Sequence, residues 1–464
     1  MIYKLYRIGL SNKIINFIDK VYEETKSAVW TGKELSRYFE TRTGVKQGCL
    51  LSPIMFALYL NDLHEYLGGG LSIDDINIRV LMYADDIVIL ADDVNILQDM
   101  IYKLEQYCRE WAMEVNLTKS EIMVFRKGGR LGTNERWTFN GENVRIVNEY
   151  KYLGMLLTPT ISFTKHVNNR NSAAKTSLNV TWKNFIGKRE LSLVAKWKMF
   201  LAVCRSMQSY GSQIDVDKLH RYFIKRILKL PDSTPNYIIA LETGLEEGHF
   251  YTFALHLKYI SKTIFKYENN RLPHLLSLKV ISKNIYWYTV FKDRLMQYNI
   301  DLHDIDRSHS LWKNASLKLI EQMKIQTYHE HITNANSSQH RIYRLLDFSK
   351  GLSYCNVKYT QSQISYIMKA RSDLLWLNGS LFREEESRSC SLCNLRELES
   401  IQHFLGRCPV LNEFRQTYFR SIRLSEEEIL YILNGGENDN WLNLYKYVRY
   451  ALRYRKILIS EYNV

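Results

Sequence analysis

The chain has 464 residues and carries 63 lysines and arginines against 49 aspartates and glutamates, a formal net charge of +14. Its length predicts two or three domains. Its charge favours a nucleic-acid partner, because phosphates bind basic side chains by releasing counterions. No apolar run approaches the ~20 residues of a spanning helix, and the N-terminus shows no apolar signal segment. We therefore expect no membrane partner.

The first predicted elements are a helix and a β-hairpin. Residues 14–22 place apolar side chains on one helical face. The polar face of this helix should hold Asp19 and Glu23 in solvent, so neither acid is expected at a buried site. Residues 28–30 and 35–43 read as the two strands of the hairpin.

A glycine-containing loop and a second helix follow. Gly44 and Gly48 leave a backbone that a template or nucleotide can approach closely, and Gln47 adds a hydrogen-bond donor and an acceptor. Residues 54–63 read as a buried helix, with Ser52 as its N-cap and Pro53 in its first turn. Taken alone, these residues favour an ordinary loop that leads into a core helix.

The sequence Tyr-Ala-Asp-Asp at residues 83–86 is the most informative stretch of the chain. It lies between two strand-like runs, residues 78–82 and 87–90, and so reads as the turn of a β-hairpin. Asp85 and Asp86 at such a tip suit Mg²⁺, which takes carboxylate oxygens and keeps water or phosphate as its other ligands. Aspartate also favours turns in general, so these four residues alone favour a plain acidic turn.

Regular elements continue to residue 147. Residues 92–111 show the 3.6-residue period of a helix with one core face. Residues 122–125 read as a short strand. Residues 137–139 and 144–147 flank the pair Asn140-Gly141, the preferred two-residue hairpin turn. Helices packed on one side of an antiparallel sheet make an α+β fold, which is the fold class we predict.

Four segments in this order resemble the polymerase domain of reverse transcriptases of non-LTR, LINE-like retrotransposons: residues 43–63, 83–86, 111–125 and 150–155. The resemblance implies a right-hand polymerase palm, Mg²⁺ or Mn²⁺, an RNA template, a DNA primer and deoxynucleoside triphosphates. It also implies catalytic metal ligation by Asp85 and Asp86, a catalytic role for Lys119, nucleotide or template contacts for Gly44, Gln47, Gly48 and Tyr83, and a primer grip at Tyr152, Leu153 and Gly154.

The resemblance leaves two functional questions open. Lys119 would donate a proton to the leaving pyrophosphate or hold it by charge, although without the resemblance a solvated surface lysine is favoured. Two-metal transfer also needs a further carboxylate from a separate strand, and in the family that strand precedes the segment that residues 1–10 resemble. We therefore expect an N-terminally truncated enzyme that is inactive by itself. The alternative is a non-catalytic retroelement remnant that binds RNA and single-stranded DNA.

We predict three regions: a palm at residues 1–160 that lacks its first catalytic strand and most of the fingers, a thumb and connector at 161–350, and a C-terminal region at 351–464. The middle region is mostly helical by pattern, with amphipathic candidates at residues 195–204, 222–229 and 250–267. The polar run at residues 334–338 reads as a linker.

The seven cysteines fall into two groups. Cys49, Cys108, Cys204 and Cys355 are scattered, which argues against a disulfide framework and for a reducing intracellular compartment, nuclear or cytoplasmic. The other three join a histidine near residues 385–415, in a Cys-x2-Cys-x9-His-x4-Cys pattern formed by Cys390, Cys393, His403 and Cys408.

This second group predicts a structural Zn²⁺ site, because such sites take four thiolate and imidazole ligands. The pattern resembles the zinc-binding segment that follows the polymerase in many of these retroelements. The plainer alternative is a set of unrelated buried thiols and a surface histidine. Nearby arginines would let the segment touch RNA, namely Arg383, Arg388, Arg396, Arg407 and Arg415.

Overall fold

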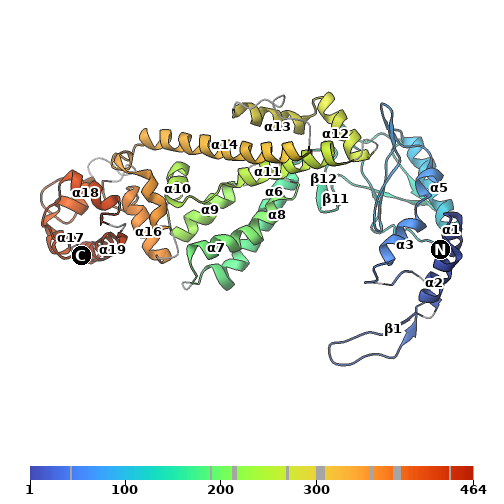
Figure 1. The fold of residues 1–464 in the computed structure, drawn as a ribbon, viewed down its shortest axis with the longest axis horizontal. Coiled ribbons are helices and arrows are strands. Elements are labelled where there is room, and N and C mark those ends of the chain that lie inside the picture. Colours follow the sequence, from blue (N-terminus) through green and yellow to red (C-terminus); the bar gives the residue numbers. More distant parts are fainter. Residues whose placement is uncertain are drawn as a thin grey trace. The chain divides into compact units, whose positions relative to one another are not determined.

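The computed structural model describes residues 1–462 except 24, 42–43, 47, 189–190, 212–216, 268–270, 299–308, 356–358, 380–387 and 438–439. The chain divides into two units, Met1–Ser162 and Phe163–Val464 (Figure 1). The first unit mixes helices and strands, and the second is built from helices. The three functional regions expected from the sequence stay a prediction. None of the described helices is both long and apolar enough to cross a membrane.

The first unit begins with helices and short strands, as the sequence predicts. In chain order these are α1 (Ile2–Arg7), α2 (Asn12–Glu23), β1 (Lys26–Ser27), β2 (Phe39–Glu40), α3 (Ser52–Tyr59) and α4 (Leu63–Leu67). Strands β1 and β2 pair antiparallel, which confirms the first hairpin, and Asp19 and Glu23 are exposed on α2. Ser52 is the first residue of α3 rather than its N-cap, because its hydroxyl donates to the Lys46 carbonyl at 2.6 Å.

The strands of this unit form separate two-stranded ladders rather than one broad antiparallel sheet. They are β3 (Leu71–Ile73) with β4 (Ile76–Ile78), β5 (Val80–Tyr83) with β6 (Asp86–Ile89), β8 (Thr138–Phe139) with β9 (Glu142–Asn143), β11 (Tyr150–Tyr152) with β12 (Met155–Leu157), and β7 (Glu121–Ile122) with β10 (Arg145–Ile146).

The last of these ladders corrects the sequence analysis. Strand β10 pairs parallel with β7, so residues 145–146 do not continue the hairpin with the 137–139 strand. The Asn140-Gly141 turn was predicted correctly and joins β8 to β9, with both residues at positive φ. The fold class is mixed helix and strand.

The long helix α5 (Val94–Glu110) organises the first unit. Asp93 is its N-cap, and its carboxylate accepts hydrogen bonds from the first turn. The helix buries Met100 and Tyr107 against residues of α3 and α4. Its other apolar face packs on Trp137 and Phe139. The 3.6-residue period therefore identified this helix correctly.

A buried lysine ties the first helix to this core. The Lys4 side chain is 5% exposed and lies 2.7 Å from the Asp62 carboxylate and 2.6 Å from the Tyr107 hydroxyl. Its ammonium also lies 3.8 Å from the centre of the Trp111 ring. These contacts fix α1 beside the loop before α4 and the C-terminal end of α5.

The second unit is a chain of helices. Its first half holds α6 (Thr164–Thr181), η1 (Trp182–Ile186), α7 (Leu193–Phe200), η2 (Leu201–Arg205), α8 (Ser206–Ser209), α9 (Asp217–Leu228), α10 (Asn236–Thr243), α11 (Gly248–Ile260), η3 (Ser261–Lys266), α12 (Leu272–Ser282), α13 (Tyr286–Gln297) and α14 (His309–Asn336). All three predicted amphipathic segments are helical.

The predicted linker at 334–338 is wrong. Most of it is the last turn of α14, where Ala335 is fully buried and the Ser338 hydroxyl is 2.7 Å from that of Tyr237. The polar composition of this helix end therefore resembles that of a linker. The chain continues through η5 (Tyr343–Leu345), η6 (Phe348–Lys350), α15 (Gly351–Tyr354), α16 (Gln361–Arg371), η8 (His403–Arg407), η9 (Pro409–Leu411), α17 (Asn412–Phe419), α18 (Glu426–Leu433) and α19 (Trp441–Tyr462).

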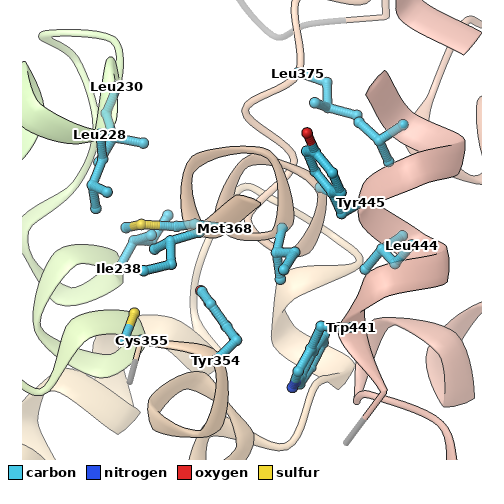
Figure 2. Packing of buried hydrophobic residues seen from close by; sticks show 14 of the residues in the cluster. Leu228, Leu230, Ile238, Tyr354, Cys355, Met368, Leu375, Trp441, Leu444 and Tyr445 are labelled. Atoms are coloured by element: carbon cyan, nitrogen blue, oxygen red, sulfur yellow. The ribbon is translucent and has the colours of Figure 1, made fainter. Parts of the chain in front are cut away.

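One hydrophobic core joins segments far apart in this unit, from Ala174 to Ala451. Figure 2 shows Met368 of α16 beside Ile238 on one side and Trp441 of α19 on the other side of the same core. A buried ion pair lies in it. Glu242 and Arg371 are both 0% exposed, with Nε 2.8 Å from Oε2 and Nη2 3.2 Å from Oε1.

Candidate active site and metal centre

The Tyr83–Asp86 stretch forms the tip of the β5–β6 hairpin, as the sequence predicts. Tyr83 pairs with Asp86, which leaves Ala84 and Asp85 as a two-residue turn. Ala84 has φ +52°, a left-handed conformation that costs an L-residue about 1–2 kcal/mol. Tyr83, Asp85 and Asp86 are exposed. The hairpin therefore presents two adjacent carboxylates to solvent on a short rigid ladder.

A second hairpin lies close to this tip. Strands β11 and β12 are joined by Leu153 and Gly154, both at positive φ. Burial, followed by the charge of Asp86, raises the pKa of the Tyr152 hydroxyl. An electrostatic effect of this kind requires proximity. Tyr152 therefore lies near the acidic tip, and Leu153 and Gly154 form the turn that follows it.

The main chain of the loop that contains Gly44 and Gly48 is accessible. Gly44 and Gly48 have φ of +88° and +79°, and a Cβ added at either would meet no heavy atom of the described residues within 4 Å. The loop is fastened to α2 by the Lys46 ammonium, which donates to the Val21 carbonyl at 2.6 Å. Both glycines therefore leave room for a ligand to approach the main chain. Gln47 lies outside the described residues.

Lys119 is exposed in a turn before β7, and its amide donates to the Asn116 carbonyl at 3.1 Å. Among the described ion pairs, none joins Lys119 to Asp85 or Asp86. Within the same described residues, sets of three or more potential ligands within 4.8 Å do not include the two aspartates. The hairpin tip accordingly offers two carboxylates to a cation.

The predicted Cys390, Cys393, His403 and Cys408 set comes together as one cluster in the second unit. All four side chains are buried, and their ligand atoms lie within 4.8 Å of one another. The Sγ atoms of Cys390 and Cys408 are 4.0 Å apart, and Cys393 Sγ lies 3.4 Å from His403 Nε2. The alternative of unrelated thiols and a surface histidine is therefore wrong. All seven cysteines are free.

The cluster has a supporting shell that sequence reasoning missed. The Glu397 carboxylate lies 2.8 Å from His403 Nδ1, which orients the ring so that Nε2 faces the thiols. Glu399, 1% exposed, binds the guanidinium of Arg455 on α19 at 2.6 Å. The position of Glu397, six residues before His403, was the sequence feature that could have indicated this contact.

Only some of the arginines predicted to touch RNA near this cluster are accessible. Arg396 and Arg407 are exposed and Arg388 is half-buried, whereas Arg383 lies outside the described residues. Arg415 is fully buried, so its prediction as an RNA contact is wrong. Its guanidinium donates to the carbonyl of Ile422 at 2.6 Å and to that of Cys408. Arg415 holds the backbone of a cluster residue instead.

Comparison with known proteins agrees with the motif order. Residues 2–157 match the family model described as reverse transcriptase (RNA-dependent DNA polymerase). The chain is 25% identical over 178 residues to the RNA-directed DNA polymerase from mobile element jockey of Drosophila melanogaster, covering 37% of this chain and 19% of that protein.

Two further relatives align over 229 and 254 residues. The probable RNA-directed DNA polymerase from transposon X-element of Drosophila melanogaster is 24% identical, with 46% of this chain and 24% of that protein covered. The Pol polyprotein from the type-1 retrotransposable element R2 of Popillia japonica is 27% identical, with 50% and 34% covered. The matched part of this chain thus spans 19% to 34% of each relative's length.

Proposed function

We propose that this chain is the part of an RNA-directed DNA polymerase of the non-LTR retrotransposon type that carries two of its catalytic carboxylates. Residues 2–157 match the reverse transcriptase family model, and the relatives from jockey and R2 support this proposal. The observation that carries the proposal is the exposed Asp85–Asp86 pair on the β5–β6 hairpin inside the matched domain. The relatives favour this enzyme over the non-catalytic alternative.

The proposed chemistry is nucleotidyl transfer from a deoxynucleoside triphosphate to a primer on an RNA template. Divalent Mg²⁺ or Mn²⁺ would stabilise the charge on the attacking and leaving oxygens. Asp85 and Asp86 would supply carboxylate oxygens to it. The open backbone at Gly44 and Gly48 would admit template or nucleotide, and the turn after Tyr152 would hold the primer near the acidic tip.

We further propose that the cysteine–histidine cluster binds Zn²⁺. Bond lengths of about 2.3 Å to sulfur and about 2.0–2.1 Å to nitrogen place tetrahedral ligand atoms roughly 3.6–3.8 Å apart. The 4.0 Å and 3.4 Å separations at the cluster lie close to those values. The buried donor set of three thiols and one oriented imidazole therefore fits a structural zinc ion.

Primer extension by an Asp85 variant tests the catalytic proposal. Two carboxylates bind a cation but do not fix two ions for in-line displacement. We therefore expect this chain to bind Mn²⁺ weakly and to extend a primer on an RNA template no faster than background. Joined to an upstream strand that supplies the third aspartate, it should extend primers, and Asp85→Ala should then lower the rate at least ~100-fold, as misplaced reacting groups do.

The matched control for this experiment is Asp92→Ala, an exposed aspartate that lies beyond the hairpin. It should leave extension by the joined protein unchanged. Clear extension by the 464-residue chain, lost on Asp85→Ala, would show that another carboxylate completes the site. Extension by the joined protein that survives Asp85→Ala would overturn the proposed catalytic role.

The net charge of +14 leads to a prediction about nucleic-acid affinity. We expect the chain to bind RNA and single-stranded DNA with weak sequence preference, because backbone phosphates are recognised through counterion release. Filter binding or fluorescence anisotropy should show the association constant falling steeply between ~50 and ~200 mM salt. Binding that does not change over this range would contradict the electrostatic mechanism.

A further inference from the structure

Four metal-ligating side chains converge in the second unit, away from the cysteine–histidine cluster. Asp217 is the first residue of α9, Glu247 precedes α11, His249 lies in the first turn of α11, and His331 lies on α14. His249 Nδ1 is 2.8 Å from Asp217 Oδ2 and 3.3 Å from Glu247 Oε2. His331 Nε2 is 2.7 Å from Glu247 Oε1.

These side chains are largely withdrawn from solvent. Their exposed fractions are 9% for Asp217, 24% for Glu247, 18% for His249 and 16% for His331. Two carboxylates held together at this depth need compensating positive charge, because burying like charges is costly. A divalent cation at the centre of the cluster would supply this charge.

A separate buried imidazole follows Asp217 by one helical turn. His220 is 3% exposed, and its ring packs against Trp197 and Phe200, with ring centroids 5.4 Å and 4.9 Å apart. Burial lowers the pKa of His220 to about 4, and the charge of Asp217 opposes this shift. His220 therefore belongs to the aromatic core beside the cluster and is not one of the metal ligands.

The ligand atoms of three side chains lie close enough to share one ion. Metal–ligand bonds of about 2.0–2.2 Å to nitrogen and carboxylate oxygen put tetrahedral ligand atoms roughly 3.3–3.6 Å apart. The ligand atoms of Asp217, Glu247 and His249 lie within 4.8 Å of one another. His249 Nδ1 and Glu247 Oε2 are at this spacing, 3.3 Å apart, whereas the 2.8 Å between His249 Nδ1 and Asp217 Oδ2 is a hydrogen-bond distance that would lengthen when the ion binds. Imidazole suits zinc and its first-row neighbours, and carboxylate is also a common zinc ligand.

We infer that Asp217, Glu247 and His249 form a second metal site, supported by His331 through its contact with Glu247, which takes a divalent first-row transition ion, with Zn²⁺ as the expected occupant. The ion would tie the N-terminal ends of α9 and α11 together, and His331 would connect them to the second half of α14. This site is independent of the proposed polymerase chemistry, because its ligands lie outside the matched domain at residues 2–157.

The absorption spectrum of bound Co²⁺ distinguishes the two metal sites. Thiolate ligands give Co²⁺ an intense near-ultraviolet charge-transfer band, and oxygen and nitrogen ligands do not. The full chain, carrying Asp85→Asn and Asp86→Asn to remove the hairpin carboxylates, is titrated with Co²⁺ after chelator treatment. We expect one equivalent with the thiolate band and a second equivalent without it. His249→Gln and Glu247→Gln should each lower the affinity for the second equivalent at least ~10-fold and leave the thiolate band intact.

Glu246→Gln is the matched control. Glu246 is adjacent in sequence but pairs with Lys324 at 2.6 Å, so its replacement should leave both equivalents unchanged. Absence of a second equivalent in the chain with His249 and Glu247 intact would overturn the inference and leave an ion-pair network. A second equivalent that survives His249→Gln with unchanged affinity would also overturn it. Loss of the thiolate band alone would count against the zinc cluster, not against this site.

Discussion

Replacing Cys393 with serine should remove one equivalent of bound zinc and loosen the C-terminal half of the second unit. A structural zinc ion contributes its binding free energy to folding, with apparent values of about 10–16 kcal/mol in small zinc-finger peptides. Here the cluster shares its core with Trp441 and Tyr447 of α19, so losing the ion should expose that helix as well. Metal analysis of the reduced full chain and hydrogen exchange over residues 388–462 would measure both effects.

The control for this prediction is Cys204→Ala, which removes a fully buried thiol of the same unit that is not part of the cluster. It should keep the zinc content of the unaltered chain and slow exchange in α19. Equal zinc content in Cys393→Ser and the unaltered chain would end the zinc assignment.

Replacing Arg371 with methionine should lower the free energy of unfolding by about 3–5 kcal/mol, because removal of one partner leaves an uncompensated buried charge. Glu242 would keep a hydrogen bond from the Tyr354 hydroxyl but lose the two hydrogen bonds that it accepts from Nε and Nη2 of Arg371. The Leu433 and Asp347 carbonyls would lose their donors as well. Denaturant unfolding followed by circular dichroism would measure the change in the second unit.

Two variants make this measurement specific. The surface pair of Arg341 and Glu426 is 4.0 Å apart, with Arg341 74% exposed, so Arg341→Met should cost no more than about 1 kcal/mol. The double variant Glu242→Met and Arg371→Met removes both charges and should recover part of the loss. A cost for Arg371→Met no larger than that for Arg341→Met would refute the structural role of the ion pair.

Local patterns were enough to predict the elements that depend on neighbouring residues. Helix α5 has a capping aspartate and a regular apolar face, and the Asn140-Gly141 and Tyr83–Asp86 turns follow from residue type. The parallel pairing of β10 with β7 escaped prediction, because it joins residues more than 20 positions apart and no local signal encodes it. Turn chemistry fixes a hairpin, but long-range pairing depends on the assembled core.

The two clusters of metal-ligating residues show the same difference between local and long-range signals. Cys390, Cys393, His403 and Cys408 lie close in sequence, and their spacing alone indicated a site. Asp217, Glu247 and His331 lie 30 residues or more apart in the sequence, and their convergence became visible only in the folded unit. Arg415 was misassigned because a basic residue near a predicted nucleic-acid contact looks exposed until its burial is known.

The packing of α19 sets the order in which this protein can mature during synthesis. The hydroxyl of Tyr447 donates to the Phe404 carbonyl at 2.6 Å, and the Glu399 counter-charge is Arg455. The cysteine ligands therefore leave the ribosome well before the helix that covers them. At ~5–20 residues per second, the roughly 50 residues between Cys408 and Arg455 take several seconds to synthesise. During that interval the thiols are open to metal capture or to oxidation, and ion supply at the ribosome would decide between the two.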